Sequence, residues 1–114
     1  MKIEKFEDIL AWQKSKILAI SAYDHFRLSK DFSFKDQVQR AAISISNNIA
    51  EGYERQSNKE FSKFLFIAKG SCAEVRSMLY IGLELKYISE KDFNTMYSLS
   101  LEISKMLSGL IKTL

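Results

Sequence analysis

Proline is absent from this 114-residue chain, and glycine occurs only 4 times. Because turns between β-strands usually use both residues, their scarcity argues against a hairpin-rich β fold. The chain has one cysteine and one histidine. A disulfide within the chain is therefore excluded, and a zinc site built from Cys and His ligands lacks members. We expect no metal and no cofactor.

Long apolar runs are also missing. None approaches the ~20 residues that span a bilayer, and the acid-containing stretch of residues 1–8 lacks the apolar segment of a secretory signal. A chain without disulfides suits a reducing compartment. We therefore expect a cytoplasmic protein with no membrane partner. Cys72 falls among apolar helical positions and is interpreted as a small core residue.

What is present is an ordinary globular composition, with 46% hydrophobic and 27% charged residues. The length suits one domain, residues 1–114. The formal net charge of +3 is mild, so it permits an acidic partner without requiring one.

Apolar residues recur at helical spacing in four segments with short breaks between them. We expect helices over residues 8–26 and 34–51, from Ser57 to about Lys86, and from Ser89 nearly to Leu114. Ser33, Ser57 and Ser89 each precede an acid by three residues, which predicts capped helix starts. Gly52 is predicted to end the second helix in the left-handed conformation. Short connections favour antiparallel neighbours, so the predicted fold class is all-α, an up-down-up-down four-helix bundle. Two helical hairpins exchanged between chains are the alternative.

The first and third helices carry apolar residues on two faces, whereas a surface helix of a monomer usually shows one stripe. On the third helix, a strip away from the predicted core contains small residues that would let another backbone approach: Phe66, Gly70, Ala73, Ser77 and Ile81. On the first helix, one face has Phe6, Ile9, Leu10, Ile17 and Ile20, and the other has Trp12, Ala19, Tyr23 and Phe26. Monomers usually avoid exposing such faces. We predict a homo-oligomer joined through Trp12 and the third-helix strip; alternatively, neighbours within the bundle cover both faces.

A polar line follows one side of the second helix at i, i+3/i+4 spacing: Gln37, Arg40, Ser44, Asn48 and Glu51, extended by Arg55. Counting back from the turn places Arg40 level with Ser71, and Gln37 near Glu74. One interpretation is a network in which Arg40 pairs with Glu74, because buried polar groups must find partners. The other is a binding surface that offers Arg40 and Arg55 to phosphates or carboxylates.

Basic residues flank both ends of the second helix. The candidate nucleic-acid contacts among them are Lys35, Arg40, Arg55, Lys59 and Lys63. Acids intervene, so a single subunit presents a mixed surface. Repeated around a symmetry axis, the same residues would form a basic track, which phosphate backbones bind through counterion release.

No catalytic arrangement is recognisable in the sequence. His25 lies in an apolar part of the first helix without a marked partner, which argues against a Ser-His-Asp triad. Ala22 stands three residues before His25, where a di-iron bundle would need Glu. A phosphate-binding GxxxxGK[ST] loop is missing. We therefore expect a protein that is not an enzyme.

Three segments together resemble a known family. They are the opening Phe6-Glu7-Asp8-Ile9-Leu10-Ala11-Trp12, residues 37–55 with Ser46-Asn47-Asn48-Ile49-Ala50-Glu51-Gly52, and residues 61–74 with Ile67-Ala68-Lys69-Gly70-Ser71. Over essentially its whole length the chain resembles the bacterial four-helix-bundle family first noticed in open reading frames within intervening sequences of 23S ribosomal RNA genes. One departure is the missing proline before the second helix, where this chain has Asp31, Phe32 and Ser33.

The resemblance implies a homopentamer with subunits around a central channel. Accessory proteins of diversity-generating retroelements are similar, and in them a basic pentameric barrel engages nucleic acid and a reverse transcriptase. By this likeness the motif positions are Gln37, Arg40, Ser44, Asn48, Glu51, Gly52, Arg55, Gly70, Ser71 and Glu74. The leading hypothesis is a non-catalytic ring that binds RNA or DNA by its phosphates. The alternative is a protein-interaction scaffold with a polar groove on the second helix and no nucleic-acid role.

Overall fold

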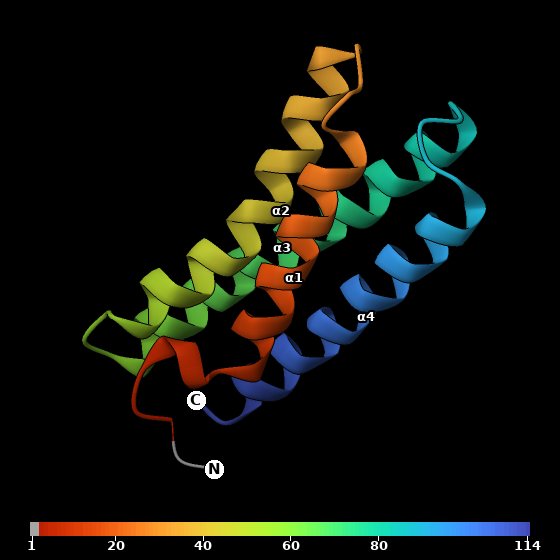
Figure 1. Ribbon diagram of the computed structural model, residues 1–114. Coiled ribbons are helices and arrows are strands. Elements are labelled where there is room, and N and C mark those ends of the chain that lie inside the picture. Colours follow the sequence, from red (N-terminus) through yellow and green to blue (C-terminus); the bar gives the residue numbers. More distant parts are fainter. Residues whose placement is uncertain (1–2) are drawn as a thin grey trace.

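The computed structural model describes residues 3–114 and contains four α-helices joined by short loops (Figure 1). The helices are α1 (Leu10–Phe26), α2 (Phe32–Tyr53), α3 (Asn58–Glu84) and α4 (Glu90–Lys112). A single 3-10 turn, η1 (Phe6–Asp8), precedes α1, so that helix begins two residues later than predicted. No strand occurs in residues 3–114. The predicted all-α fold class is confirmed.

Consecutive helices run in opposite directions and pack side by side, and α4 returns to contact α1 (Figure 1). No Cα atom of α1 lies within 8 Å of a Cα atom of α3, so these two helices occupy diagonal corners of the bundle. The bundle measures 42 × 22 × 19 Å. The α1–α2 and α3–α4 loops lie at one end, and the α2–α3 loop lies at the other (Figure 1). The outward sides of α1 and α3 therefore face opposite directions.

Apolar side chains from all four helices fill one continuous core. Its largest fully buried members include Phe26, Leu18, Ile45, Ile49, Leu65, Leu79, Met96, Ile103 and Leu107. Cys72 is fully buried among them, and its Sγ donates to the Ser100 carbonyl oxygen at 3.0 Å. Burial raises the pKa of the Cys72 thiol, which keeps it protonated. The interpretation of Cys72 as a core residue is confirmed.

The helix starts at α3 and α4 are capped as predicted. The Ser57 Oγ accepts a hydrogen bond from the Glu60 amide at 3.1 Å. The Ser89 Oγ accepts one from the Asp92 amide, also at 3.1 Å. Each bond satisfies an amide that has no partner within the helix.

The predicted cap of α2 is wrong. This helix begins at Phe32 rather than Phe34, and the Asp31 Oδ1, not the Ser33 hydroxyl, accepts from the Phe34 amide at 3.1 Å. The Asp31 Oδ2 also accepts from the Tyr87 hydroxyl at 2.7 Å. Because Asp31 both caps α2 and joins the α1–α2 loop to the α3–α4 loop, the tertiary contact favours it over the serine two residues later.

Gly52 does not adopt the predicted left-handed conformation. It lies inside α2, and among the residues that the structure describes no glycine has a positive φ. A Cβ on Gly52 would lie 2.5 Å from the Phe64 Cβ and 3.1 Å from the Phe61 Cδ1. The glycine is therefore needed because α2 and α3 meet closely at this level, not because the helix ends there.

Candidate functional site

The outward face of α3 is the strip predicted from the sequence, and the bundle's own helices leave it uncovered. Phe66 is 58% exposed and Ile81 is 48% exposed. Gly70, Ala73 and Ser77 between them are exposed as well. No neighbouring atom lies within 4 Å of a Cβ placed on Gly70. The strip is thus a shallow surface of small side chains between two large apolar ones, open to another backbone.

The outward face of α1 is also apolar, but its membership differs from the prediction. Leu10, Ile17 and Ile20 are each about half exposed, whereas Ile9, predicted to join them, is buried in the core. Tyr23 is exposed beside Ile20. A hollow of about 360 Å³ follows this side of α1, lined by Lys16, Ala19, Ile20, Tyr23, Asp24, Ile43 and Ser46.

The Trp12 side chain is only partly exposed on the surface of the bundle. It is half-buried against the core, and its ring meets the Phe6 ring edge-on at a centroid distance of 5.1 Å. Ala19 and Phe26, grouped with Trp12 from the sequence, are buried. Because apolar residues occur almost all round α1, their spacing alone assigned some of them to the wrong face of the helix. A subunit contact would reach only the exposed part of the Trp12 ring.

Three of the predicted polar residues come together between α2 and α3. The Ser71 Oγ donates to the Ser44 Oγ at 2.9 Å. The Asn48 Nδ2 donates to the Ser44 carbonyl oxygen at 2.8 Å and to the Ser44 Oγ at 2.9 Å. All three residues are half-buried, so these bonds align the two helices.

The predicted pairing of Arg40 with Glu74 is wrong. The Arg40 Nε lies 2.9 Å from the Asp36 Oδ2, one turn earlier on the same helix. Ser44, rather than Arg40, stands level with Ser71. Because α2 continues through Gly52, counting from that glycine displaced the register by one turn. Gln37 and Glu74 are exposed, as is Glu51.

The candidate nucleic-acid contacts lie at opposite ends of α2. The Lys35 Nζ donates to the Arg27 carbonyl oxygen at 2.9 Å, near the start of the helix. Past its end, the Arg55 guanidinium lies 3.4 Å from the Glu51 Oε1 and 4.9 Å from the Phe64 ring centroid. The 22 residues of α2 span ~33 Å. On one subunit these cations therefore form no single patch.

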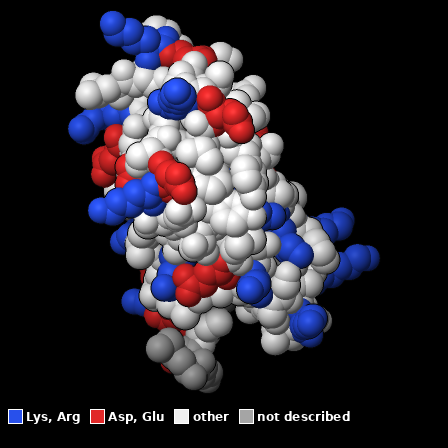
Figure 2. Space-filling model, turned by 90° about the vertical axis from the view of Figure 1, so that its right-hand side faces the viewer, with Lys and Arg blue, Asp and Glu red and all other residues white. Residues whose placement is uncertain are grey.

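Lys59 and Lys63 belong to a second group of cations, which we call the α3–α4 basic surface: Lys59, Lys63, Lys69, Lys105 and Lys112. The bond from Cys72 to Ser100 sets the level of α3 against α4, so the later part of α4 lies beside the earlier part of α3. Figure 2, which looks onto the α4 side, shows Lys and Arg side chains gathered at the lower right, below a broad uncharged area. Within residues 3–114, none of these five lysines forms an ion pair.

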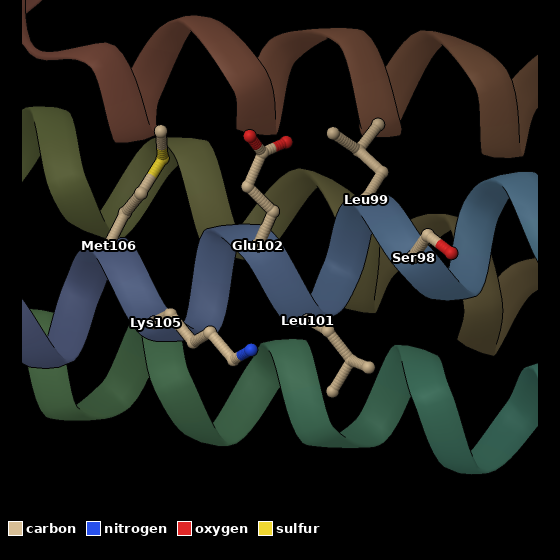
Figure 3. A pocket seen from close by; sticks show the side chains of 6 residues that line it. All are labelled: Ser98, Leu99, Leu101, Glu102, Lys105 and Met106. Carbon is tan, nitrogen blue, oxygen red and sulfur yellow. The ribbon is translucent and has the colours of Figure 1, made fainter.

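A hollow of about 640 Å³ on the outer side of α4 adjoins the basic surface. It is lined by Ser98, Leu99, Leu101, Glu102, Lys105 and Met106. Figure 3 shows Glu102 turned toward α1 and Lys105 turned toward α3. The Glu102 Oε1 lies 3.4 Å from the Lys14 Nζ on α1, so its charge is already paired. The Lys105 ammonium gives the edge of this hollow that is nearer α3 a positive charge.

The expectation that His25 has no partner is wrong. This residue is exposed, and its Nε2 lies 3.4 Å from the Asp92 Oδ2 on α4. Its Nδ1 lies 2.8 Å from the Ser21 carbonyl oxygen and 3.2 Å from the Ser21 Oγ. A proton on Nδ1 would be donated to the Ser21 carbonyl oxygen, whereas an unprotonated Nδ1 would accept the proton of the Ser21 hydroxyl.

No group of His, Cys, Asp and Glu suited to a metal ion occurs in the part of the chain that the structure describes. Likewise, none of its helices combines the length and apolar character needed to cross a membrane.

Comparisons with known proteins agree with the fold. A family model described as 23S rRNA-intervening sequence protein matches residues 7–109. A crystal structure from Bacteroides thetaiotaomicron, of a protein with unknown function from the S23 ribosomal protein family, is similar with a TM-score of 0.85 and 28% sequence identity. The similarity covers 90% of this chain and 99% of that chain. A search of curated proteins found no match.

Proposed function

Because the chain belongs to the 23S rRNA-intervening sequence protein family, we propose that it is a non-catalytic bundle that assembles with copies of itself into a ring and binds RNA or DNA by the phosphates. A pentamer is the proposed size of the ring. The observation that carries the proposal is the α3–α4 basic surface, whose lysines border an uncovered apolar strip.

The placement of the two apolar faces supports head-to-tail assembly rather than a two-fold dimer. The α1 face and the α3 strip differ in composition and lie on diagonal corners of the bundle. A two-fold dimer would pair one face with itself and leave the other exposed. Contact between the α1 face of one subunit and the α3 strip of the next covers both faces, and such head-to-tail contacts generate closed rings when the rotation closes.

The size of the apolar side chains fits a contact of this kind. Leu10, Ile17 and Ile20 on α1, with Phe66 and Ile81 on α3, are each about half exposed. Covering the exposed half of such a side chain contributes about 0.8–1.5 kcal/mol, half the value for complete burial. Small residues at Gly70 and Ala73 let the partner helix approach, which adds close packing to this burial.

The lysines would be repeated around the ring. Lys59 and Lys63 continue the α3 strip toward the start of that helix, so each subunit contact would be bordered by cations. Lys69, Lys105 and Lys112 widen the same surface toward α4. Lysines that neutralise the phosphates of a nucleic acid displace the counterions condensed on it. The release of these ions favours binding, and this gain falls as salt rises.

The proposal is tested by fluorescence anisotropy with a labelled RNA duplex over a series of KCl concentrations. We expect a log-log slope of affinity against salt of ~0.9 per neutralised phosphate if binding behaves as on duplex DNA. The double variant Lys63→Glu with Lys105→Glu should abolish binding. Its matched control, Lys5→Glu with Lys91→Glu, changes the net charge equally but elsewhere, and should retain most of the affinity.

Two outcomes contradict nucleic-acid binding through this surface. One is an affinity that does not change with salt. The other is equal binding by the two double variants. The alternative of a partner groove on α2 has less support, because Ser44, Asn48 and Ser71 hydrogen-bond to one another and fill that part of the polar line.

A further inference from the structure

One end of the bundle exposes large apolar side chains that neither apolar face includes. Leu28, in the α1–α2 loop, is 86% exposed, and Phe32, at the start of α2, is 72% exposed. The α3–α4 loop lies beside them, held by the hydrogen bond from the Tyr87 hydroxyl to Asp31. Both loops lie at the upper end of the bundle in Figure 1. We call this end, residues 27–35 with residues 85–89, the loop tip.

The Phe32 ring is placed beside polar groups rather than alone. The Lys35 Nζ lies 5.8 Å from the ring centroid, and its bond to the Arg27 carbonyl oxygen holds it there. An open hollow of about 460 Å³ adjoins the ring, lined by Phe32, Ser33, Lys35, Asp36 and Gln39. A nucleotide needs a flat surface on which its base can stack, hydrogen-bond partners for the edge of the base, and a cation for its phosphate. The Phe32 ring offers the flat surface, the Ser33 hydroxyl and the Gln39 amide offer hydrogen bonds, and the Lys35 ammonium offers the charge.

The charges of the loop tip favour an anionic ligand. Its cations are Arg27, Lys30, Lys35 and Lys86. Its acid, Asp31, is engaged by the Tyr87 hydroxyl and the Phe34 amide. Asp36, one residue beyond, is paired with Arg40. Glu84 and Glu90 directly flank residues 85–89, on the adjoining helix ends. The four cations therefore outnumber these two acids, which are the ones left for a ligand.

Lys86 gives an independent indication. It has a φ of 63°, and it is the one residue other than glycine with a positive φ in residues 3–114. The Tyr87 amide donates to the Gly82 carbonyl oxygen at 2.8 Å, so Lys86 stands where a helix end usually has glycine. A basic side chain at a position where glycine would be unstrained suggests a use for its charge.

We propose that the loop tip binds an unpaired nucleotide, with its base stacked on Phe32 and its phosphates beside Arg27, Lys30 and Lys86. This inference rests on the proposed function and specifies its ligand. Bases inside a duplex are stacked on each other and cannot reach Phe32, whereas bases in single strands and loops can be splayed onto an aromatic ring. The tip would give the protein a preference for single-stranded RNA or DNA.

The test compares a labelled oligouridine strand with a labelled RNA duplex by fluorescence anisotropy. Phe32→Leu keeps an apolar side chain but removes the aromatic face, and it should weaken single-strand binding by ~5- to ~150-fold, the range given by a stacking energy of about 1–3 kcal/mol per base. Duplex binding should not change. Phe32→Tyr should restore single-strand binding. Leu28→Ala alters an even more exposed apolar side chain that has no aromatic ring, and it should leave single-strand binding intact.

The outcomes separate this inference from the proposed function. If Phe32→Leu and the wild type bind the single strand with equal affinity, base stacking at the loop tip is wrong. The exposed apolar side chains of the tip would then be assigned to a contact with a protein partner. Equal weakening toward strand and duplex overturns it too, since stacking acts only on unpaired bases. A wild-type protein that binds the duplex alone overturns the inference and leaves the proposed function standing. Binding to neither probe overturns both.

Discussion

At the scale of single residues, the missing side chain of Gly52 sets the closest approach of α2 to α3. The Phe64 Cβ lies 2.5 Å from the place that a Cβ on Gly52 would take, and that atom is attached to the α3 backbone. It cannot move aside by rotation about a side-chain bond, so the helices themselves would have to separate.

Gly52→Ala should therefore lower the free energy of unfolding. Alanine gains about 1 kcal/mol over glycine from helix propensity, but overpacking costs typically 1–3 kcal/mol, and a contact of 2.5 Å belongs near the upper end of this range. We expect a net loss of about 1–2 kcal/mol in urea denaturation. Gly109→Ala is the control: nothing lies within 4 Å of its Cβ position, so it should be stabilising. Unchanged or raised stability of Gly52→Ala would contradict the close approach.

Asp31 predicts a pH dependence. Hydrogen bonds from the Tyr87 hydroxyl and the Phe34 amide lower the pKa of its carboxyl below the usual value. A group with a lowered pKa in the folded state stabilises the fold above its unfolded pKa of about 3.9, and that contribution is lost as the pH falls through the folded pKa. The stability difference between the wild type and Asp31→Ala should therefore shrink below about pH 4.

The measurement is urea denaturation of both proteins from neutral to acidic pH. Ser57→Ala removes a helix cap that does not titrate, so its difference from the wild type should vary much less with pH. A pH-independent difference for Asp31→Ala would mean that the cap does not depend on the charged carboxylate.

At the scale of helices, the faces of α1 and α3 decide whether subunits can meet. Gly70 stands in the middle of the α3 strip with open space at its Cβ position. Gly70→Leu should prevent close approach of another helix and lower the sedimentation coefficient of the assembly. Ser98→Leu adds a leucine at an exposed position on the outer side of α4, which belongs to neither apolar face, and should leave the assembly intact.

Sedimentation velocity at several protein concentrations checks this prediction. If both leucine variants sediment like the wild-type ring, the α3 strip is not the contact. If the wild-type protein sediments as a single subunit even at high concentration, the ring itself is wrong.

The same helices show how far a sequence pattern reaches. On α3, the spacing of apolar residues correctly placed Cys72 in the core and Phe66 and Ile81 on the exposed side. It failed on α1, where apolar residues occur almost all round the helix and Ile9 was placed on the wrong face. A periodic pattern locates a buried face only when the remaining faces are polar.

At the scale of the whole molecule, charge becomes informative only after the helices are packed. The net charge of +3 is small, and basic residues are spread along the chain. Lys59 and Lys63 stand one turn apart and could be grouped from the sequence. Lys105 and Lys112, more than forty positions later, join them only because α4 runs antiparallel beside α3.

By itself, the sequence determined the all-α fold class, four helices, the caps at Ser57 and Ser89, the burial of Cys72 and the apolar strip on α3. These features depend on residues close together in the chain, where helical spacing and capping act. Only the tertiary structure decided the bond between Ser44 and Ser71, the reason for Gly52, the cap at Asp31 and the α3–α4 basic surface. Each depends on how far one helix is shifted along another, and that shift is set by the packing of side chains distant in sequence.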